Sequence, residues 1–438
     1  EKGEYGRRIS ELEKSMDFQL DLLQKQAVEE ALTKGVVVVT GGPGTGKTTT
    51  INLMIRCFEM EKMDIVLAAP TGRAAKRMTE ATGYEAKTIH RLLEVSGGIE
   101  DGDSSHFEKN EDNPIEADAV ILDEMSMVDI HLMYSLLKAI VPGTRLILVG
   151  DSNQLPSVGP GNVLKDIIDS KAFSVVRLSK IYRQAESSHI VLNAHKINAG
   201  ELITLDNKNK DFFFFEKKDV RSVMGALVYL VKTRLPEYIG ASPFEIQVLT
   251  PMRKGELGVE HLNEVLQYYL NPASESKKEK EGRTGVFREG DKVMQVKNNY
   301  KLEWKITNAK GFSIEEGLGV FNGDMGIIKQ INTYSERITV VFDENREAEY
   351  PFSSLDELEL AYAITIHKSQ GSEYPAVVLP LLSGPPILCN RNLLYTAITR
   401  AQKCVAIAGR QSMVEQMIHN ETEQKRYSGL NDCLKEGL

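Results

Sequence analysis

The stretch VVVVTGGPGTGKTTT, residues 36–50, decides the fold. Its first five residues form an uninterrupted β-branched run, which is typical of a parallel strand buried on both faces. A glycine-rich loop follows and leads into a helical segment, INLMIRCFEM, at residues 51–60. Strand, loop and helix in this order are the setting of a phosphate-binding P-loop, Gly-x4-Gly-Lys-Thr. The stretch predicts an α/β domain that binds a nucleoside triphosphate, and the alternative is a glycine turn without a ligand.

The residue types in this loop suit a triphosphate. Its glycines, from Gly41 onward, let backbone N–H groups surround an anion. Lys47 is expected to reach the β- and γ-phosphates of ATP, and the Thr48 hydroxyl to bind Mg²⁺. The residues expected to contact the nucleotide are Gly42, Pro43, Gly44, Thr45, Gly46, Lys47, Thr48 and Thr49.

Two further apolar strands end in polar residues. Residues 119–122 are followed by Asp123 and Glu124, and ligands bind at the carboxyl ends of strands in α/β sheets. Asp123 is expected to share Mg²⁺ with Thr48, and Glu124 to orient or deprotonate the attacking water. A solvated acidic pair that opens a loop is the alternative. The strand at residues 146–149 precedes Gln154, whose neutral amide suits sensing of a γ-phosphate.

Composition sets the broad class. The chain has 438 residues, 42% hydrophobic and 26% charged, which predicts a soluble protein of two to four domains. No run of about 18 apolar residues occurs, so no membrane span is expected. The four cysteines have neither metal-ligand nor framework spacing, which favours the cytoplasm. The net charge of −9 argues against a nucleic-acid coat protein but permits a local groove. The absence of an initiating Met leaves room for a further upstream domain.

A four-letter phrase occurs twice. TIHR stands at residues 88–91 and TIHK at 365–368. Chance could produce one such match, but each phrase follows a strand–loop–helix stretch and precedes another strand. The pattern predicts two related α/β lobes, of which only the first has a P-loop. Arg183 and Arg400 are candidates for an arginine that stabilises transferring phosphate, and a surface residue or structural ion pair is the alternative for each.

Eight motifs occur in a characteristic order: GGPGTGKT, APTGRAAKRM, TIHRLL, LDEMSM, VGDSNQLPSVGPG, IYRQ, TIHKSQGSE and YTAITRAQ. From about residue 20 to the end, the chain resembles superfamily 1 helicases. The sequences of these motifs are most similar to those of the RecD-like branch, which includes stand-alone bacterial DNA helicases. The resemblance implies an α/β fold of two RecA-like motor domains with a small β-hairpin (pin) insertion and an SH3-like β-barrel insertion.

The resemblance also implies roles for individual residues. Gln24 would contact the adenine, Arg183 and Arg400 the γ-phosphate, and Gly371 and Glu373 would lie near both nucleotide and strand. The other implied contacts are with DNA, where hydroxyls and amides set register without reading sequence. They are Pro70, Thr71, Arg73, Thr88 and His90 in the first lobe and Thr250, Thr365, His367 and Lys368 in the second.

The domain boundaries follow from the motifs and two insertions. The first motor domain is expected at 1–178, with a pin-like hairpin at 94–117 in which Phe107 could stack on an end base pair. The SH3-like barrel is expected at 285–352, where period-2 stretches alternate with turn glycines. The second motor domain takes up the remainder, residues 179–284 and 353–438.

The resemblance implies an ATP-dependent DNA helicase of repair or recombination. It would move 5′ to 3′ on single-stranded DNA and unwind duplex at junctions, as a monomer in the cytoplasm. One alternative is a helicase that remodels RNA or RNA–protein complexes, since nothing in the sequence reads a 2′-hydroxyl. Others are a P-loop regulator or kinase that ignores nucleic acid, and an ATPase subunit active only within a larger complex.

Overall fold

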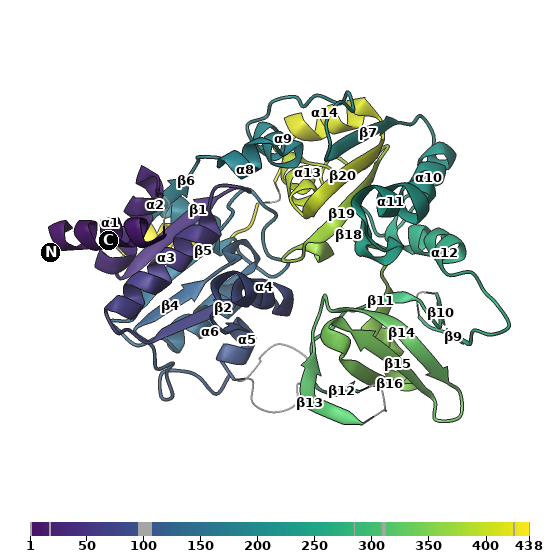
Figure 1. Ribbon diagram of the computed structural model, residues 1–438, viewed down its shortest axis with the longest axis horizontal. Helices are drawn as coiled ribbons and strands as arrows, with labels where there is room; N and C mark the ends of the chain where they lie inside the picture. Colours follow the sequence, from purple (N-terminus) through teal and green to yellow (C-terminus); the bar gives the residue numbers. More distant parts are fainter. Residues whose placement is uncertain are drawn as a thin grey trace. The chain divides into compact units, whose positions relative to one another are not determined.

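The computed structural model describes residues 2–16, 19–94, 107–283, 285–308, 312–423 and 425–437. The chain divides into two compact units (Figure 1): Glu1–His195 with Gln424–Leu438, and Lys196–Glu423. The sequence predicted this division at residue 178 and assigned the C-terminal end to the second motor domain. The observed division falls later, and the last residues return to the first unit because they pack on its helix α7.

A six-stranded parallel sheet forms the centre of the first unit, in the order β3-β2-β4-β5-β1-β6. The predicted strands at residues 36–40, 119–122 and 146–149 lie within it. Its strands are β1 (Val36–Gly41), β2 (Ile65–Ala69), β3 (Ala86–Thr88), β4 (Ala119–Leu122), β5 (Arg145–Gly150) and β6 (Ser174–Leu178).

Helices cover both faces of this sheet, which explains the unbroken valine run. Val37 and Val39 pack into one core with helices α2 and α3, while Val38 faces a second core with α6 and α7. Because successive side chains of a strand point to opposite faces, every position of β1 meets apolar neighbours and no polar alternation remains. The helices named are α2 (Leu22–Thr33), α3 (Lys47–Met60), α6 (Ile130–Lys138) and α7 (Val163–Ser170), and α1 (Lys2–Met16) contacts α2.

A five-stranded parallel sheet forms the centre of the second unit, in the order β18-β8-β19-β20-β7. Its helices include α10 (Val220–Tyr229), α12 (Val259–Leu270), α13 (Arg391–Ile398) and α14 (Gln411–His419), and α9 (His189–Asn198) spans the division between the units. The strands are β7 (Phe212–Glu216), β8 (Ile246–Thr250), β18 (Ala363–Thr365), β19 (Tyr374–Leu381) and β20 (Ala401–Gly409).

An antiparallel sheet of seven strands is inserted into this unit, in the order β13-β12-β16-β15-β14-β11-β17. It lies where the sequence predicts a small antiparallel barrel and continues past residue 352 to its last strand. Its strands are β11 (Lys292–Gln295), β12 (Asn299–Thr307), β13 (Ser313–Val320), β14 (Met325–Asn332), β15 (Arg337–Phe342), β16 (Glu347–Pro351) and β17 (Leu358–Leu360), and a separate hairpin of β9 (Glu279–Glu281) and β10 (Val286–Arg288) precedes them.

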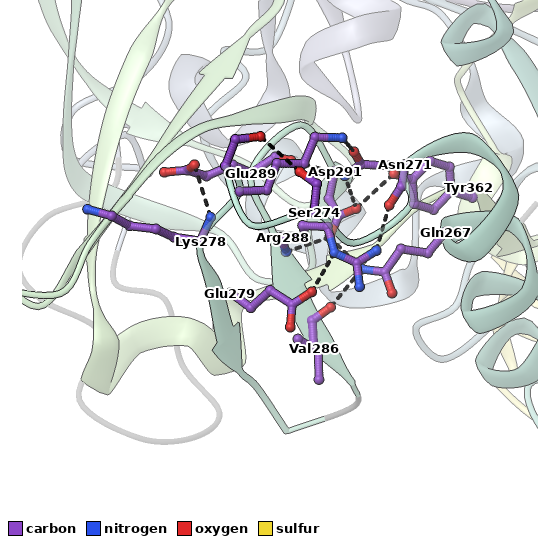
Figure 2. A network of polar contacts seen from close by, with 12 residues as sticks. Gln267, Asn271, Ser274, Lys278, Glu279, Val286, Arg288, Glu289, Asp291 and Tyr362 are labelled. Carbon is purple, nitrogen blue, oxygen red and sulfur yellow. Dashed lines mark hydrogen bonds and ion pairs between the residues drawn. The ribbon is translucent and has the colours of Figure 1, made fainter.

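A buried carboxylate joins this insertion to the rest of the second unit. Asp291 is fully buried, and Figure 2 shows polar groups converging on it. Its Oδ1 accepts from Asn271 Nδ2 (2.7 Å) and the Tyr362 hydroxyl (2.8 Å). Its Oδ2 accepts from Gln267 Nε2 (2.6 Å) and the Arg288 backbone N–H (2.7 Å). Burial raises the pKa of Asp291, while these hydrogen bonds act against that shift. Of the four donors, Gln267 lies on α12 and Asn271 directly follows it, Arg288 lies on β10, and Tyr362 lies between β17 and β18.

The predicted pin falls largely outside the described residues, since 95–106 are not among them. The two described sides of this insertion are joined by backbone hydrogen bonds, from Glu108 to the Glu94 carbonyl (2.8 Å) and from Lys109 to the Leu93 carbonyl (3.0 Å). Over the described part of the chain, none of the helices combines the length and apolar character that crossing a membrane requires.

The Asp291 network predicts a graded loss of stability. Replacing Asp291 with Ala leaves four buried donors without their acceptor and should lower the unfolding free energy of this unit by about 3 kcal/mol. Tyr362→Phe removes one donor and should cost about 1 kcal/mol. Trp304 is the chain's one tryptophan and packs against the same core, so its fluorescence during urea unfolding reports the change. Glu281→Ala, on the exposed edge of β9, is the control, and equal midpoints for all four proteins would contradict the assigned role.

Candidate functional site

The P-loop has the predicted local structure. β1 ends at Gly41, and α3 begins at Lys47. Gly44 (φ +72°) and Gly46 (φ +81°) adopt left-handed conformations that side chains other than glycine rarely tolerate. The Lys47 ammonium donates to the carbonyls of Gly41 (2.6 Å) and Gly42 (3.0 Å). The lysine therefore lies over the loop, with its charge satisfied by oxygens that phosphate oxygens can replace.

The other loop residues divide into internal and outward ones. The Thr45 hydroxyl donates to the Gly42 carbonyl (2.7 Å) and stabilises the turn. The Pro43 carbonyl lies 3.0 Å from a ring nitrogen of His195. Thr48 is exposed, as a metal-binding hydroxyl must be. Thr49 instead lines a surface hollow between α3 and α4, so the structure gives it no place at the phosphate site.

Gln24 lies against the P-loop, as its predicted contact with the nucleotide requires. It is fully buried, and its Nε2 donates to the Gly46 carbonyl (3.3 Å). The Tyr182 hydroxyl contacts both Gln24 Oε1 and Asp21 Oδ2, the latter at 2.9 Å. A Cβ on Gly46 would come within 2.6 Å of Gln24 Nε2. Gln24 and Tyr182 thus form one wall beside the loop, and the Tyr182 backbone N–H also bonds to the Gly44 carbonyl.

The acidic pair after β4 is desolvated. The Glu124 N–H donates to Asp123 Oδ1 (2.7 Å), and the Asp123 N–H donates to the Ala68 carbonyl (3.0 Å). Burial, and then repulsion by Glu124, raise the pKa of Asp123 to about 6, while Lys47 and Arg77 lower it. Lys47 and Asp123 are therefore close enough to act on one another, which is the arrangement expected around a phosphate-bound metal.

The loop after β5, residues 151–161, is called the sensor loop here because it carries Gln154. Asp151 shapes its first turn by accepting from the Asn153 N–H (3.0 Å). Ser152 ties the turn to β1, since its N–H donates to the Thr40 hydroxyl (3.3 Å). Gln154 Nε2 makes a long contact with Asp151 Oδ2 (3.5 Å), and its Oε1 is buried with no hydrogen-bond partner among the described residues.

These residues fit a nucleoside triphosphate and a hard divalent cation. The loop has the left-handed glycines, Gly44 and Gly46, that let its backbone curl around a phosphate. Thr48 and Asp123 supply the hydroxyl and carboxylate oxygens that Mg²⁺ prefers. The buried oxygen of Gln154 is a polar group that lacks a partner and would gain one from a ligand.

The predicted nucleic-acid contacts of the first unit gather at one edge of its sheet. β2 and β3 are parallel neighbours, with Ala69 paired to Thr88, so their carboxyl ends meet. Pro70 follows β2 directly, and Thr71 caps helix α4 (Gly72–Thr82) by accepting from the Ala74 N–H (3.2 Å). Arg73 lies in the first turn of that helix. The structure thus brings Pro70, Thr71, Arg73 and Thr88 together.

His90 completes this group. It lies in the single-turn helix α5 (Ile89–Leu92), and burial lowers its pKa while Asp129 opposes the shift. A neutral imidazole at physiological pH would contact a phosphate by hydrogen bonding rather than by charge. Its ring packs on Phe107, with centroids 5.9 Å apart.

Phe107 lies where the described part of the predicted hairpin meets the core of the first unit. The sequence places it in a hairpin as an aromatic that could stack on an end base pair. In the structure the ring is half-buried against His90 and the core beneath α6. The apolar ring is stabilised there by burial, so support of His90 fits its position better than stacking on DNA.

The contacts predicted for the second unit lie at the corresponding edge. Thr250 of β8 and Thr365 of β18 are paired at the ends of two parallel strands. Thr250 is buried, however, and its hydroxyl donates to the Leu257 carbonyl (2.7 Å), so it shapes the following loop. Lys368 forms an ion pair with Glu359 (3.3 Å), and His367 begins the turn η6 (His367–Ser369).

The two Thr-Ile-His phrases are structural equivalents. Each threonine ends an edge strand, β3 or β18, and each is followed by a single helical turn. The Thr88 hydroxyl accepts from the Arg91 N–H (3.1 Å), and the Thr365 hydroxyl accepts from the Lys368 N–H (3.3 Å). Each threonine hydroxyl therefore closes a turn onto the backbone N–H three residues ahead, a bond that does not depend on which side chain stands there.

The remaining predicted residues belong to α8 and to the second unit. Arg400 is 2% exposed, its Nη1 donates to the Ser372 carbonyl (3.2 Å), and its Nε has no hydrogen-bond partner within the described part of the chain. Gly371 (φ +72°) makes the turn that brings Ser372 there, and Glu373 contacts Gln402 (3.3 Å). Arg183 begins α8 (Arg183–Glu186), and its side chain is outside what the structure describes.

Two arginines were missed by the sequence reasoning. Arg77 of α4 pairs with Glu124. Arg426 donates to the carbonyls of Gly159 and Gly161 (3.1 Å for the latter), so the C-terminal segment, residues 425–437, holds the sensor loop. The motif APTGRAAKRM contains Arg77, but only the spatial neighbourhood of Glu124 reveals its contact. No signal in the sequence singles out Arg426.

A P-loop unit with paired carboxylates, joined to a second parallel-sheet unit without a P-loop, defines a two-lobed RecA-like ATPase. Three family models match the chain: an AAA domain at residues 24–160, the SH3 domain of ATP-dependent RecD-like DNA helicases at 262–342, and a UvrD-like helicase C-terminal domain at 360–408. The chain belongs to the RecD-like family of superfamily 1 helicases. This confirms the predicted family and fold class.

Relatives support this membership along most of the chain. The ATP-dependent RecD2 DNA helicase of Deinococcus radiodurans is 36% identical over 88% of this chain, which spans about half (48%) of that protein. The RecBCD enzyme subunit RecD of Mycolicibacterium smegmatis is 31% identical over 94% of the chain and 74% of its own length. Bacteroides Pif1 bound to ssDNA has the same fold, with a TM-score of 0.52 at 18% identity over 95% of this chain and 96% of that one.

The raised pKa of Asp123 predicts a stabilising substitution. The folded protein holds this proton more tightly than the unfolded chain does (about 6 against 3.8), so ionisation destabilises the fold as the pH rises through this range. Asp123→Asn should raise the unfolding free energy in EDTA by on the order of 2–3 kcal/mol at pH 7, and by about half as much at pH 5. Urea unfolding at both pH values measures this.

The matched control is Asp112→Asn, which removes an exposed carboxylate and should change little at either pH. A loss of stability in Asp123→Asn at pH 7 would contradict the desolvated, repelled state assigned to Asp123.

Proposed function

We propose that this chain is the motor of an ATP-dependent DNA helicase that moves along single-stranded DNA, 5′ to 3′, and separates duplex at junctions in repair or recombination. The observation that carries the proposal is the equivalence of the two Thr-Ile-His turns, one at the edge of each parallel sheet. A translocating motor must hold one nucleic-acid strand at two sites, whereas a P-loop regulator or kinase needs no such site. The names of the RecD2 and RecD relatives support DNA as the substrate.

The chemistry would use the first unit's own residues. Lys47 binds the β- and γ-phosphates of ATP, and Thr48 and Asp123 hold Mg²⁺, which neutralises phosphate charge when bound. Glu124 accepts a proton from the attacking water. Gln154 turns its buried amide oxygen toward the reacting group, and Gln24 contacts the adenine. Gly371 and Glu373, near nucleotide and strand, together with the γ-phosphate role of Arg183 and Arg400, remain part of this proposal.

The grips would contact the DNA backbone rather than the bases. Thr71 and Thr88 present capped turns whose backbone N–H groups suit phosphate oxygens, and His90 adds a neutral hydrogen-bonding group. Thr365, His367 and Lys368 provide the second set. Thr250 would act indirectly, through the loop that its hydroxyl holds. Such binding is independent of sequence, as a translocating enzyme requires. We further propose that the protein works as a cytoplasmic monomer.

Steady-state ATP hydrolysis with and without single-stranded DNA tests the proposal. At low salt, where phosphate contacts are strongest, DNA should stimulate hydrolysis by wild-type protein. Lys47→Ala should lower kcat by about 10²–10³-fold, because the charge opposite the transferring phosphate is lost, and should retain DNA binding. Duplexes with 5′ or 3′ tails then report polarity.

A single-stranded RNA of the same base sequence is the matched control. Equal or greater stimulation by RNA would favour the RNA-remodelling alternative. A Lys47-dependent rate that neither nucleic acid changes would contradict a motor and favour a P-loop regulator or a subunit that requires partners.

A further inference from the structure

The carboxylate of Glu124 is held by a residue outside the acidic motif. Its Oε1 is paired with Nη2 of Arg77, which lies on α4 and is 47 residues away in the chain. The Glu124 side chain is 12% exposed and that of Arg77 31% exposed, so the pair is partly shielded from water. A charge-assisted contact of this kind is stronger than a neutral hydrogen bond and directs a carboxylate oxygen away from water.

The backbone fixes this arrangement. Glu124 has φ +55° and ψ +40°, a left-handed conformation that is uncommon for a residue with a Cβ. Its carbonyl accepts from the Met127 N–H (3.0 Å), and its N–H is bonded to Asp123, so the residue has little freedom to rotate as a whole. Redirection of its carboxylate therefore depends on the side chain and on the group that holds it.

Helix α4, which carries Arg77, also begins at the proposed DNA-binding residues of the first unit. Thr71 caps α4, and Arg73 lies in its first turn. Arg73 and Arg77 are four residues apart, which places them on the same face of the helix. A phosphate bound at the start of α4 would thus meet the element on which Arg77 is mounted, one turn from it.

The inner face of α4 is made mainly of small side chains. Ala74 and Ala75 pack with Ala69 of β2, and Met78 is the one large buried residue of the helix. Methyl groups and a flexible thioether interlock less with a sheet than branched side chains do. A small shift of α4 against β2 therefore meets little steric resistance.

We propose that Arg77 is a positioning residue that withholds the Glu124 carboxylate from the attacking water until nucleic acid engages the first turn of α4. The inference rests on the proposed function and deepens it, since it explains how DNA would stimulate hydrolysis. Binding at Thr71 and Arg73 shifts α4, the Arg77 contact is exchanged for one to water or phosphate, and Glu124 becomes available as a base. Hydrolysis without a strand to move along is thereby suppressed.

Substitutions of Arg77 distinguish two roles: restraint of the Glu124 carboxylate before DNA binds, and structural support of Glu124. Arg77→Ala should raise kcat for ATP without DNA by about tenfold, leave KM for ATP within about twofold, and leave the DNA-stimulated kcat close to wild type. Arg77→Lys keeps a cation at this position and should restore most of the restraint. Lys76→Ala, on the neighbouring exposed position where Lys76 pairs with Glu80, is the matched control and should behave as wild type.

A basal kcat that is unchanged or lower in Arg77→Ala, with DNA stimulation intact in wild type, overturns this inference and leaves the proposed function standing. Arg77 would then only support Glu124. If nucleic acid fails to stimulate the wild-type protein, both the proposed function and the inference fail. Should Arg77→Ala not fold, Arg77→Gln, which keeps most of the aliphatic stem and removes the charge, gives the same decision.

Discussion

The register of three parallel strands is the constraint on which the site depends. Thr40 of β1 pairs with Gly150 of β5, and Leu122 of β4 pairs with Leu148 of β5. Because β1, β4 and β5 are parallel, their carboxyl ends lie at one edge of the sheet, and the P-loop, the acidic pair and the sensor loop start there. A slip of one residue would turn Val38 and its neighbours to the opposite face, so packing of both cores fixes the site.

That edge concentrates charge in a place poor in water. Asp123 and Glu124 are adjacent carboxylates, and their mutual repulsion is offset by Lys47 on one side and Arg77 on the other. Lys47 also donates to the carbonyls of Gly41 and Gly42 in the loop. Under the proposed function, phosphate and metal would replace some of these contacts rather than enter an empty space. The site is stable before it binds a ligand because its own groups stand in for those of the substrate.

Features with local causes could be predicted from the sequence. The buried strands and the P-loop follow from valine and glycine patterns, and the family follows from motif order. Phe107 lies within the predicted pin, and its contact with His90 is tertiary, so no local pattern indicates that contact. Arg77 and Arg426 lie 47 and 267 residues from their partners, beyond any local pattern.

The Arg426 contact shows that residues near the C-terminal end of the chain hold the sensor loop within the first unit. The first residues of α13 bind the irregular segment that follows α14. Arg391 pairs with Glu421 (2.5 Å), and Asn392 donates to Glu423 (2.6 Å). α13 ends two residues before Arg400. Three residues after Glu423, Arg426 holds the sensor loop of the first unit. The residues on either side of this point in the chain are thus attached by polar side chains within their own units, Glu421 and Glu423 to α13 in the second unit and Arg426 to the loop that carries Gln154 in the first.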